Sequence, residues 1–300
     1  MNETKITVLL PTYNRASLLP RAIRCITEQT FSAWRLLVIN DGGEDVSDLI
    51  RSFNDPRIEY IPLQHQGKAA VLNCGLSMVR SKYVTYMDDD DEVFPQHLEK
   101  LYNFAENTNS EFVFSDTYIT VLNARNRVVS RFVENDKNVC YEDLRLHNRI
   151  NHKQIMHTTR LAERIGGYDT KMAVLVDYDF IKRLAAEVVP RRLPEVTGNH
   201  FLYSSDSEQI SSLWTRDPEA AGRSLLSFFQ KDPAALAYLY SNDLPLKREL
   251  SEIKECITFK LLKYLLLPEI IIRKLIIIWK YFGIKGIIEK IISQSTNKAR

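Results

Sequence analysis

The chain has 300 residues, 45% hydrophobic and 26% charged, so it can bury a large core and lacks the composition of a disordered protein. Its net charge of +2 conceals a basic C-terminal part, because from Leu246 onward there are 12 Lys and Arg against 5 Glu. The four cysteines form no CxxC pair, which favours buried, reduced thiols over zinc ligands or disulfides.

Strand-like and helix-like segments alternate in the N-terminal third. Runs rich in Val, Ile and Tyr at residues 5–10, 35–39, 57–61 and 83–87 predict four strands. Between them, residues 18–29, 46–53 and 69–79 place apolar side chains at helical spacing. A βαβ series of this kind builds a parallel sheet covered on both faces, with ligands at the carboxyl ends of its strands. We therefore expect an α/β fold whose function lies in the loops after these strands.

Polar loops follow three of the predicted strands, at residues 11–15, 40–43 and 88–92. In the last of them, the four consecutive aspartates from Asp88 to Asp91 repel one another, and a site that holds them normally needs a cation. Magnesium or manganese takes one or two carboxylates and completes its shell with water and phosphate oxygens. A merely solvated acidic loop is the competing interpretation, but its position at the functional edge of a sheet favours a site for a metal and a diphosphate.

The second half predicts further elements. Residues 111–116 indicate a strand, and residues 117–122 and 127–132 indicate a hairpin. His152 and His157 precede a helix, and His200 is expected in a loop that runs through Gln209. Since a lone histidine is more often structural than a ligand, none is predicted to bind metal.

From residue 4 to about 215, the chain resembles a family 2 glycosyltransferase of the GT-A fold. Each matching piece is short, but their order and spacing together are specific. The matching stretches are VLLPTYNR at 8–15, EQTF at 28–31, VINDG at 38–42, GKAAVLNCGL at 67–76, the acidic loop, RIGGYD at 164–169 and DYDF at 177–180. The chain departs from the family pattern at Asn40 and Gly43, where Asp and Ser are usual, and at Val176, where Glu or Gly is usual.

The resemblance implies a role for each matching residue. Asp90 would hold a divalent metal, Mg²⁺ or Mn²⁺, that neutralises the leaving diphosphate. Asp177 would be the general base of an inverting transfer, with Asp179 as the alternative. An N-cap is the competing role for Asp177, and plain solvated surface is the competing role for Lys68. The residues expected to contact the nucleotide are Pro11, Tyr13, Asp41, Lys68, Asp88 and Asp89.

The expected organisation has three parts. Residues 1–110 would form the nucleotide-sugar-binding half of a GT-A domain with a mostly parallel central sheet, and residues 111–216 the acceptor-binding half with the catalytic base. Residues 217–300 predict a helical, basic, amphipathic extension. Lysines interrupt its Ile- and Leu-rich segment before any run reaches the roughly 18 residues that span a bilayer. The extension would therefore either lie on an anionic membrane or pack against protein.

The sequence thus predicts an inverting hexosyl- or N-acetylhexosaminyltransferase that uses a nucleotide diphosphate sugar as donor. A UDP-sugar is the first choice. Its acceptor would be a glycan or glycolipid in bacterial-type cell-surface polysaccharide or glycolipid synthesis, with no nucleic-acid partner. Glu3 and Lys5 beside a short apolar run argue against a secretory leader, so we expect a cytoplasmic protein with peripheral contact to the inner face of the membrane.

Three alternatives belong to other classes of protein. A non-catalytic nucleotide-sugar-binding module would keep the acidic loop without a working base. A nucleotidyltransferase would need a glycine-rich, basic first loop, and residues 11–15 contain no glycine. A dinucleotide-dependent oxidoreductase would need GxGxxG after the first strand, and that motif is missing there.

Overall fold

The computed structural model describes residues 3–123, 125, 127–134, 138–145 and 148–203, together with residues 224, 227 and 231. The chain divides into two compact units, and the one formed by residues 1–144 and 148–207 holds every helix and strand described below. Apart from those three single positions, the predicted C-terminal extension lies outside the described residues.

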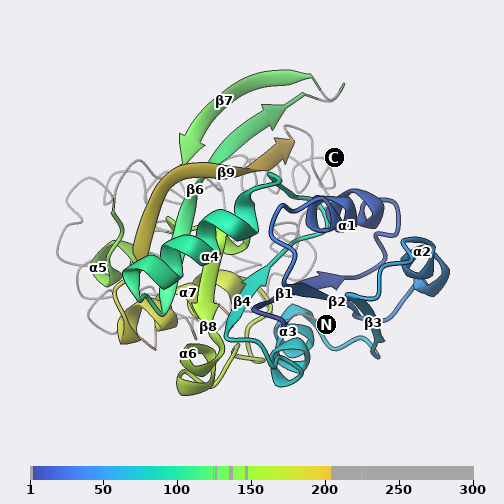
Figure 1. The fold of residues 1–300 in the computed structure, drawn as a ribbon, viewed down its shortest axis with the longest axis horizontal. Coiled ribbons are helices and arrows are strands. Elements are labelled where there is room, and N and C mark those ends of the chain that lie inside the picture. The colour runs from blue at the N-terminus through green and yellow to red at the C-terminus, as the bar shows by residue number, and fades with distance from the viewer. Residues whose placement is uncertain are drawn as a thin grey trace, which may run out of the picture. The chain divides into compact units, whose positions relative to one another are not determined.

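The N-terminal half of the sheet is parallel. Its spatial order is β3-β2-β1-β4 (Figure 1). The strands are β1 (Ile6–Thr12), β2 (Trp34–Asn40), β3 (Ile58–Pro62) and β4 (Tyr83–Tyr86), and the helices between them are α1 (Leu19–Thr27), α2 (Ser47–Ser52) and α3 (Lys68–Ser77). Every element ends within two residues of its predicted bounds, so the predicted βαβ series is confirmed.

Beyond β4 the sheet changes character. It continues through β8 (Ile155–Thr158), β6 (Phe112–Leu122), β9 (Arg191–Tyr203) and β5 (Glu92–Val93), and β7 (Val128–Glu134) also pairs with β6. In this half only β6 and β9 are parallel to each other. The predicted hairpin is confirmed as β6 and β7, but the strand predicted separately at residues 111–116 is the first part of β6.

The second half also supplies four α-helices and a short 3-10 helix. Their bounds are α4 (His97–Thr108), α5 (Tyr141–Leu144), η1 (His152–Gln154), α6 (Thr159–Arg164) and α7 (Val176–Glu187). Because η1 leads directly into β8 and β4 is hydrogen-bonded to β8, residues of the second half lie beside the strand that carries the acidic loop.

Successive residues of β1 face opposite layers. Ile6, Val8 and Leu10 are buried in one core together with residues of α1, α2 and α4. Leu9 and Ile39 lie against α3, where Gly75 permits a close approach: a Cβ at Gly75 would be 2.5 Å from the Ile39 Cδ1. A strand covered on both faces reads as a continuous apolar run, which is why β1 does not alternate.

Two histidines are buried within this framework. The Nδ1 of His97 in α4 is 2.6 Å from the Thr197 Oγ1, and the Nε2 of His157 in β8 is 2.8 Å from the Tyr86 hydroxyl. Burial lowers the pKa of His97 to about 3 and that of His157 to about 4. Both imidazoles are therefore neutral in the folded protein at neutral pH.

We expect these histidines to make the protein less stable as the pH falls from about 7 to about 5. The unfolded imidazoles take up protons around their ordinary pKa of 6.5, whereas the folded ones stay neutral, so added protons favour unfolding. Each histidine contributes a slope of up to about 1.4 kcal/mol per pH unit. Urea unfolding across this range measures the slope, and the His97→Gln variant should flatten it. An unchanged slope in the variant would contradict the expectation.

Candidate active site

The acidic loop leaves the carboxyl end of β4 beside the end of β1. Thr12 is the last residue of β1, and its hydroxyl donates to the Asp89 Oδ2 at 3.0 Å. The main-chain N–H of Asp91 donates to the Asp88 carbonyl at 3.3 Å, and Arg21 donates to the Asp90 carbonyl at 2.6 Å. The predicted convergence of strand ends is thus present, and the loop backbone is held from α1 as well.

Each of the four aspartates is paired with a basic side chain. The pairs are Asp88 with Lys68 at 2.9 Å, Asp89 with Arg15 at 2.9 Å, Asp90 with Arg15 at 3.1 Å, and Asp91 with Lys153 at 2.9 Å and His200 at 2.7 Å. Protein cations therefore offset much of the mutual repulsion that the sequence assigned to a metal ion alone. Asp88 and Asp90 keep 23% and 31% of their side chains exposed, whereas Asp89 and Asp91 are almost fully buried.

The same residue type has a different protonation equilibrium at each position. Burial alone would raise the pKa of Asp91, but Lys153 and His200 hold it well below its ordinary value. Burial raises the pKa of Asp89 to about 6 despite the opposing charge of Arg15. Burial and the charges of Asp88 and Asp91 also raise the pKa of Asp90. Negative charge is therefore least compensated around Asp89 and Asp90.

Lys68 connects the acidic loop with the second half of the chain. It is the first residue of α3, and its side chain is only 18% exposed, so the solvated-surface interpretation is wrong. Burial alone would lower its pKa, but the charges of Asp88, Asp177 and Asp90 raise it. Lys68 thus contacts Asp88 directly, and the charges of Asp177 and Asp90 also act on its ammonium group.

Asp41 shapes the loop that precedes α3. Its carboxylate accepts the main-chain N–H groups of Gln66 at 2.8 Å and Gly67 at 3.0 Å. Gly67 has a φ of 92°, a left-handed conformation that glycine adopts without strain. Asp41 therefore fixes the turn that delivers Lys68, a role that the sequence did not predict.

Tyr13 lies at the same edge of the sheet. Its ring is 43% exposed and stacks on the imidazole of His65 with a centroid distance of 4.3 Å, and His65 Nδ1 is 2.9 Å from the Asp41 carboxylate. Pro11, paired in register with Ile39, lies within β1 rather than after it. The nucleotide-contacting residues predicted in the first two loops are therefore neighbours, and His65 is an addition.

Asp177 lies in the first turn of α7 and is partly exposed. The residue that caps the helix is Leu175, whose φ of 59° is left-handed, and no side-chain capping bond is present. The N-cap interpretation of Asp177 is therefore wrong. Val176, the departure from the family pattern, is buried, so this position serves the core of the protein.

Asp179, the alternative base, is 1% exposed and accepts a hydrogen bond from the Arg183 Nε at 2.8 Å. Arg183 also donates to the carbonyls of Ile165 and Gly167. These contacts tie α7 to the turn after α6. Of the two aspartates in the helix, Asp177 is the one with exposed carboxylate surface.

A side-chain clamp between Asn73 and the backbone of Tyr168 joins α3 to the turn after α6. The amide of Asn73 donates to the Tyr168 carbonyl at 2.8 Å and accepts the Tyr168 N–H at 2.7 Å. Tyr168 stacks on Phe180 of α7 at a centroid distance of 3.9 Å, and its hydroxyl is 2.7 Å from the Nε2 of His152. The helix that carries Lys68 and the helix that carries Asp177 are thus joined through Tyr168.

The remaining histidines and cysteines differ in part from expectation. His152 is buried in this aromatic cluster, and His200 lies in β9 rather than in a loop. Cys25 and Cys74 are partly buried, but Cys140 is exposed, so the expectation of buried thiols is wrong there. Cys256 lies outside the described residues.

The donor set at the acidic loop fits a divalent cation. A hard cation such as Mg²⁺ takes one or two carboxylates and fills its other positions with water and phosphate oxygens. Asp88 and Asp90 are the partly exposed carboxylates of the loop. The pKa of Asp90 is raised, and a bound cation would stabilise its ionised form. In the part of the chain that the structure describes, no group of three or more His, Cys, Asp and Glu side chains is gathered at one point.

The strand order and the acidic loop after β4 define a protein of the GT-A fold class. A family model described as "Glycosyl transferase family 2" matches residues 7–166, more than half of the chain. The chain belongs to this family, as its motifs predicted.

Relatives in the family come from several bacteria. An uncharacterized glycosyltransferase of Rickettsia bellii is 35% identical over 119 residues, 39% of this chain and 17% of that protein. The uncharacterized glycosyltransferase YwdF of Bacillus subtilis is 28% identical over 63% of this chain and 71% of its own length. The putative colanic acid biosynthesis glycosyl transferase WcaA of Escherichia coli is 26% identical over 65% and 72%. The match to the Rickettsia protein thus spans less than a fifth of that relative's length.

Solved structures support the fold. S. aureus TarS 1–349 in complex with UDP-GlcNAc matches 75% of this chain and 65% of its own with a TM-score of 0.59 and 16% identity. The mannosyltransferase PcManGT from Pyrobaculum calidifontis, in complex with GDP-Man and Mn²⁺, matches 92% of this chain and 87% of its own with a TM-score of 0.52 and 16% identity.

In the described residues, none of the helices is long and apolar enough to cross a membrane.

We predict that Arg15→Met raises the pKa of Asp89 from about 6 by at least about one unit, because the positive charge of Arg15 opposes the effect of burial more than any other group does. Carboxyl ¹³C NMR titration measures this shift. Arg51→Met is the matched control, since Arg51 forms an exposed ion pair with Asp48. A pKa of Asp89 that stays in place after loss of Arg15 would contradict the prediction.

Proposed function

We propose that this chain is an inverting glycosyltransferase that moves a hexosyl or N-acetylhexosaminyl group from a UDP-sugar to an acceptor hydroxyl. The observation that carries the proposal is the position of Lys68, which is ion-paired with Asp88 at 2.9 Å and whose pKa is also raised by the charges of Asp177 and Asp90. It joins a phosphate-binding edge of the sheet to a partly exposed carboxylate on a separate helix. Residues 1–110 would bind the donor, and residues 111–216 would bind the acceptor.

In this proposal the nucleobase lies against Tyr13, and Pro11 contributes main-chain contacts. Asp41 accepts the imide N–H of uracil. Its Oδ2 accepts the N–H of Gly67 and lies 2.9 Å from His65 Nδ1, whereas its Oδ1 accepts the N–H of Gln66 and has a second lone pair for a further bond. The ligands in the solved structures of TarS, UDP and UDP-GlcNAc, support a UDP-sugar as donor, whereas GDP-Man in the structure of PcManGT supports the wider class of nucleotide sugars.

The diphosphate would lie between Lys68 and the acidic loop, with Asp88 and Asp89 on the nucleotide side. Asp90 is the residue proposed to hold Mg²⁺ or Mn²⁺, and the bound cation would supply positive charge to the departing diphosphate. Lys68 gives the diphosphate a second positive charge. Since Asp89 already accepts bonds from Thr12 and Arg15, its part would be mainly to orient Arg15.

Asp177 would remove the proton from the acceptor hydroxyl as its oxygen attacks the anomeric carbon opposite the diphosphate. One carboxylate is sufficient for this single displacement, which inverts the configuration of the transferred sugar. Asp179 is engaged with Arg183 and is not proposed as the base. Because WcaA is named for colanic acid biosynthesis, we propose a glycan or glycolipid acceptor in cell-surface polysaccharide synthesis, with the C-terminal extension near the inner face of the membrane.

We expect Asp177→Asn to lower kcat by at least about a hundredfold with an unchanged melting temperature, because it removes a general base from the helix surface. The matched control is Asp179→Asn in the same helix, which weakens a buried ion pair. It should lower the melting temperature while kcat per folded molecule changes by less than about threefold. Sugar transfer and calorimetry measure the two effects. Equal losses of kcat in both variants would contradict the assignment.

Thermal stabilisation by nucleotides tests the donor. With Mn²⁺ present, we expect UDP-sugars to raise the melting temperature more than GDP-sugars do, because ligands that bind only the folded state stabilise it in proportion to affinity. Lys68→Met should reduce this shift. Larger shifts with a GDP-sugar would overturn the choice of UDP and leave the class of reaction standing.

Val176, in place of the usual Glu or Gly, keeps a non-catalytic nucleotide-sugar-binding module as the second candidate. Such a module would bind the donor and release no sugar, in wild type and Asp177→Asn alike. A nucleotidyltransferase would instead release pyrophosphate from a nucleoside triphosphate. Product analysis with both kinds of donor separates the three activities.

A further inference from the structure

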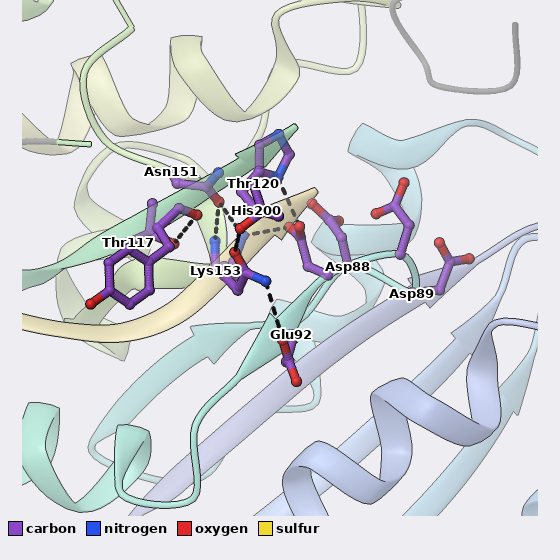
Figure 2. Close-up of polar contacts among 12 residues, drawn as sticks. Asp88, Asp89, Glu92, Thr117, Thr120, Asn151, Lys153 and His200 are labelled. Carbon is purple, nitrogen blue, oxygen red and sulfur yellow. Dashed lines mark hydrogen bonds and ion pairs between the residues drawn. The ribbon is translucent and has the colours of Figure 1, made fainter. Parts of the chain in front are cut away.

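Beneath the acidic loop lies a lysine that the proposed reaction does not use. The Lys153 side chain is 0% exposed, and its Nζ is 2.9 Å from the Asp91 Oδ2 and 3.4 Å from the Asn151 Oδ1. Figure 2 shows Lys153, Asn151 and His200 gathered beside the loop that carries Asp88 and Asp89. A fully buried ammonium group is costly to desolvate, so it needs a close partner.

The partner is held from two sides. While Lys153 of η1 contacts one oxygen of Asp91, the Nδ1 of His200 in β9 is 2.7 Å from the other oxygen. With both oxygens occupied and 3% of its side chain exposed, the Asp91 carboxylate is bonded within the protein.

Asp91 belongs to the same turn as Asp88 and Asp90, so its contact with Lys153 also restrains the backbone of those two residues. Asp91 directly follows Asp90, and its N–H closes a turn onto the Asp88 carbonyl at 3.3 Å. Arg21 of α1 donates a hydrogen bond to the Asp90 carbonyl at 2.6 Å. The backbone between Asp88 and Asp91 is therefore fixed at a carbonyl by Arg21 and at a side chain by Lys153.

We propose that Lys153 is a positioning residue for the donor site: by holding the Asp91 carboxylate, it keeps the acidic loop in the conformation that presents Asp88 and Asp90 to the diphosphate and its cation. The inference rests on the proposed function for what those two carboxylates bind. The ordering of the loop by Lys153 does not depend on that function. Lys153 itself touches no substrate.

The matched control is a second buried ion pair in the same unit. Arg192 of β9 donates to both oxygens of Asp116 in β6, at 2.7 and 2.6 Å, and Asp116 is 4% exposed. Each substitution removes a long basic side chain from a buried carboxylate, although Asp91 keeps His200, so both Lys153→Met and Arg192→Met should lower the melting temperature. Only Lys153→Met should disturb the acidic loop.

Hydrogen exchange of the native full chain is the first measurement, because it requires no ligand. We expect the amides of residues 88–93 to exchange at least about tenfold faster in Lys153→Met than in wild type, and to be unchanged in Arg192→Met. Lys153→Gln, which keeps a polar group in the pocket, is the second variant and should show a smaller effect in the same direction. Unchanged exchange of this loop in both Lys153 variants, or equal acceleration in Arg192→Met, overturns the inference.

Binding of UDP in the presence and absence of Mn²⁺ is the second measurement. Loss of residues that orient ligand-bearing groups typically costs about 10–100-fold in metal affinity, so Lys153→Met should weaken Mn²⁺-dependent UDP binding by that range and metal-free binding by less than about threefold. If wild type binds UDP with Mn²⁺ and Lys153→Met matches it, the inference fails while the proposed function stands. If wild type shows no such binding, the proposed function fails, and hydrogen exchange still decides the role of Lys153.

Discussion

The site depends on the balance of charge around four adjacent carboxylates that are largely removed from water. At low effective dielectric constant, an ionised aspartate is stable only when a cation or several donors face it. Arg15 from the loop after β1, Lys68 from α3 and Lys153 from η1 meet this need at three points of the acidic loop. Because these residues come from distant parts of the sequence, the loop can adopt its conformation only when both halves of the sheet have formed.

This balance divides one residue type into two kinds of group. The carboxylates of Asp89 and Asp91 are buried and bonded within the protein, whereas those of Asp88 and Asp90 keep surface in contact with solvent. Burial and pairing, rather than the type of residue, therefore determine which acids serve the fold and which are open to a ligand. The sequence motif alone, with four identical residues, does not distinguish these two kinds of carboxylate.

The fold and the site could be predicted from the sequence where they depend on residues close together in the chain. Strand and helix bounds in the first half follow from periodicity and turn residues, and the family motifs predicted the loops that meet at the site. The partners of Asp91 were missed because they lie in η1 and β9, and a pairing across such separations leaves no local pattern. The N-cap interpretation of Asp177 was wrong because the left-handed backbone of Leu175 starts α7 without a capping side chain, and Leu is rarely found in that conformation.

The amide clamp between Asn73 and Tyr168 has a consequence for engineering. It secures the chain just before the segment that enters α7, while Leu175 sets the start of that helix. Between these two anchor points, the side chains of Thr170, Lys171 and Ala173 are exposed, whereas Met172 and Val174 are buried. A library that randomises the three exposed positions would diversify the surface beside the helix while its anchors and the buried residues between them stay in place.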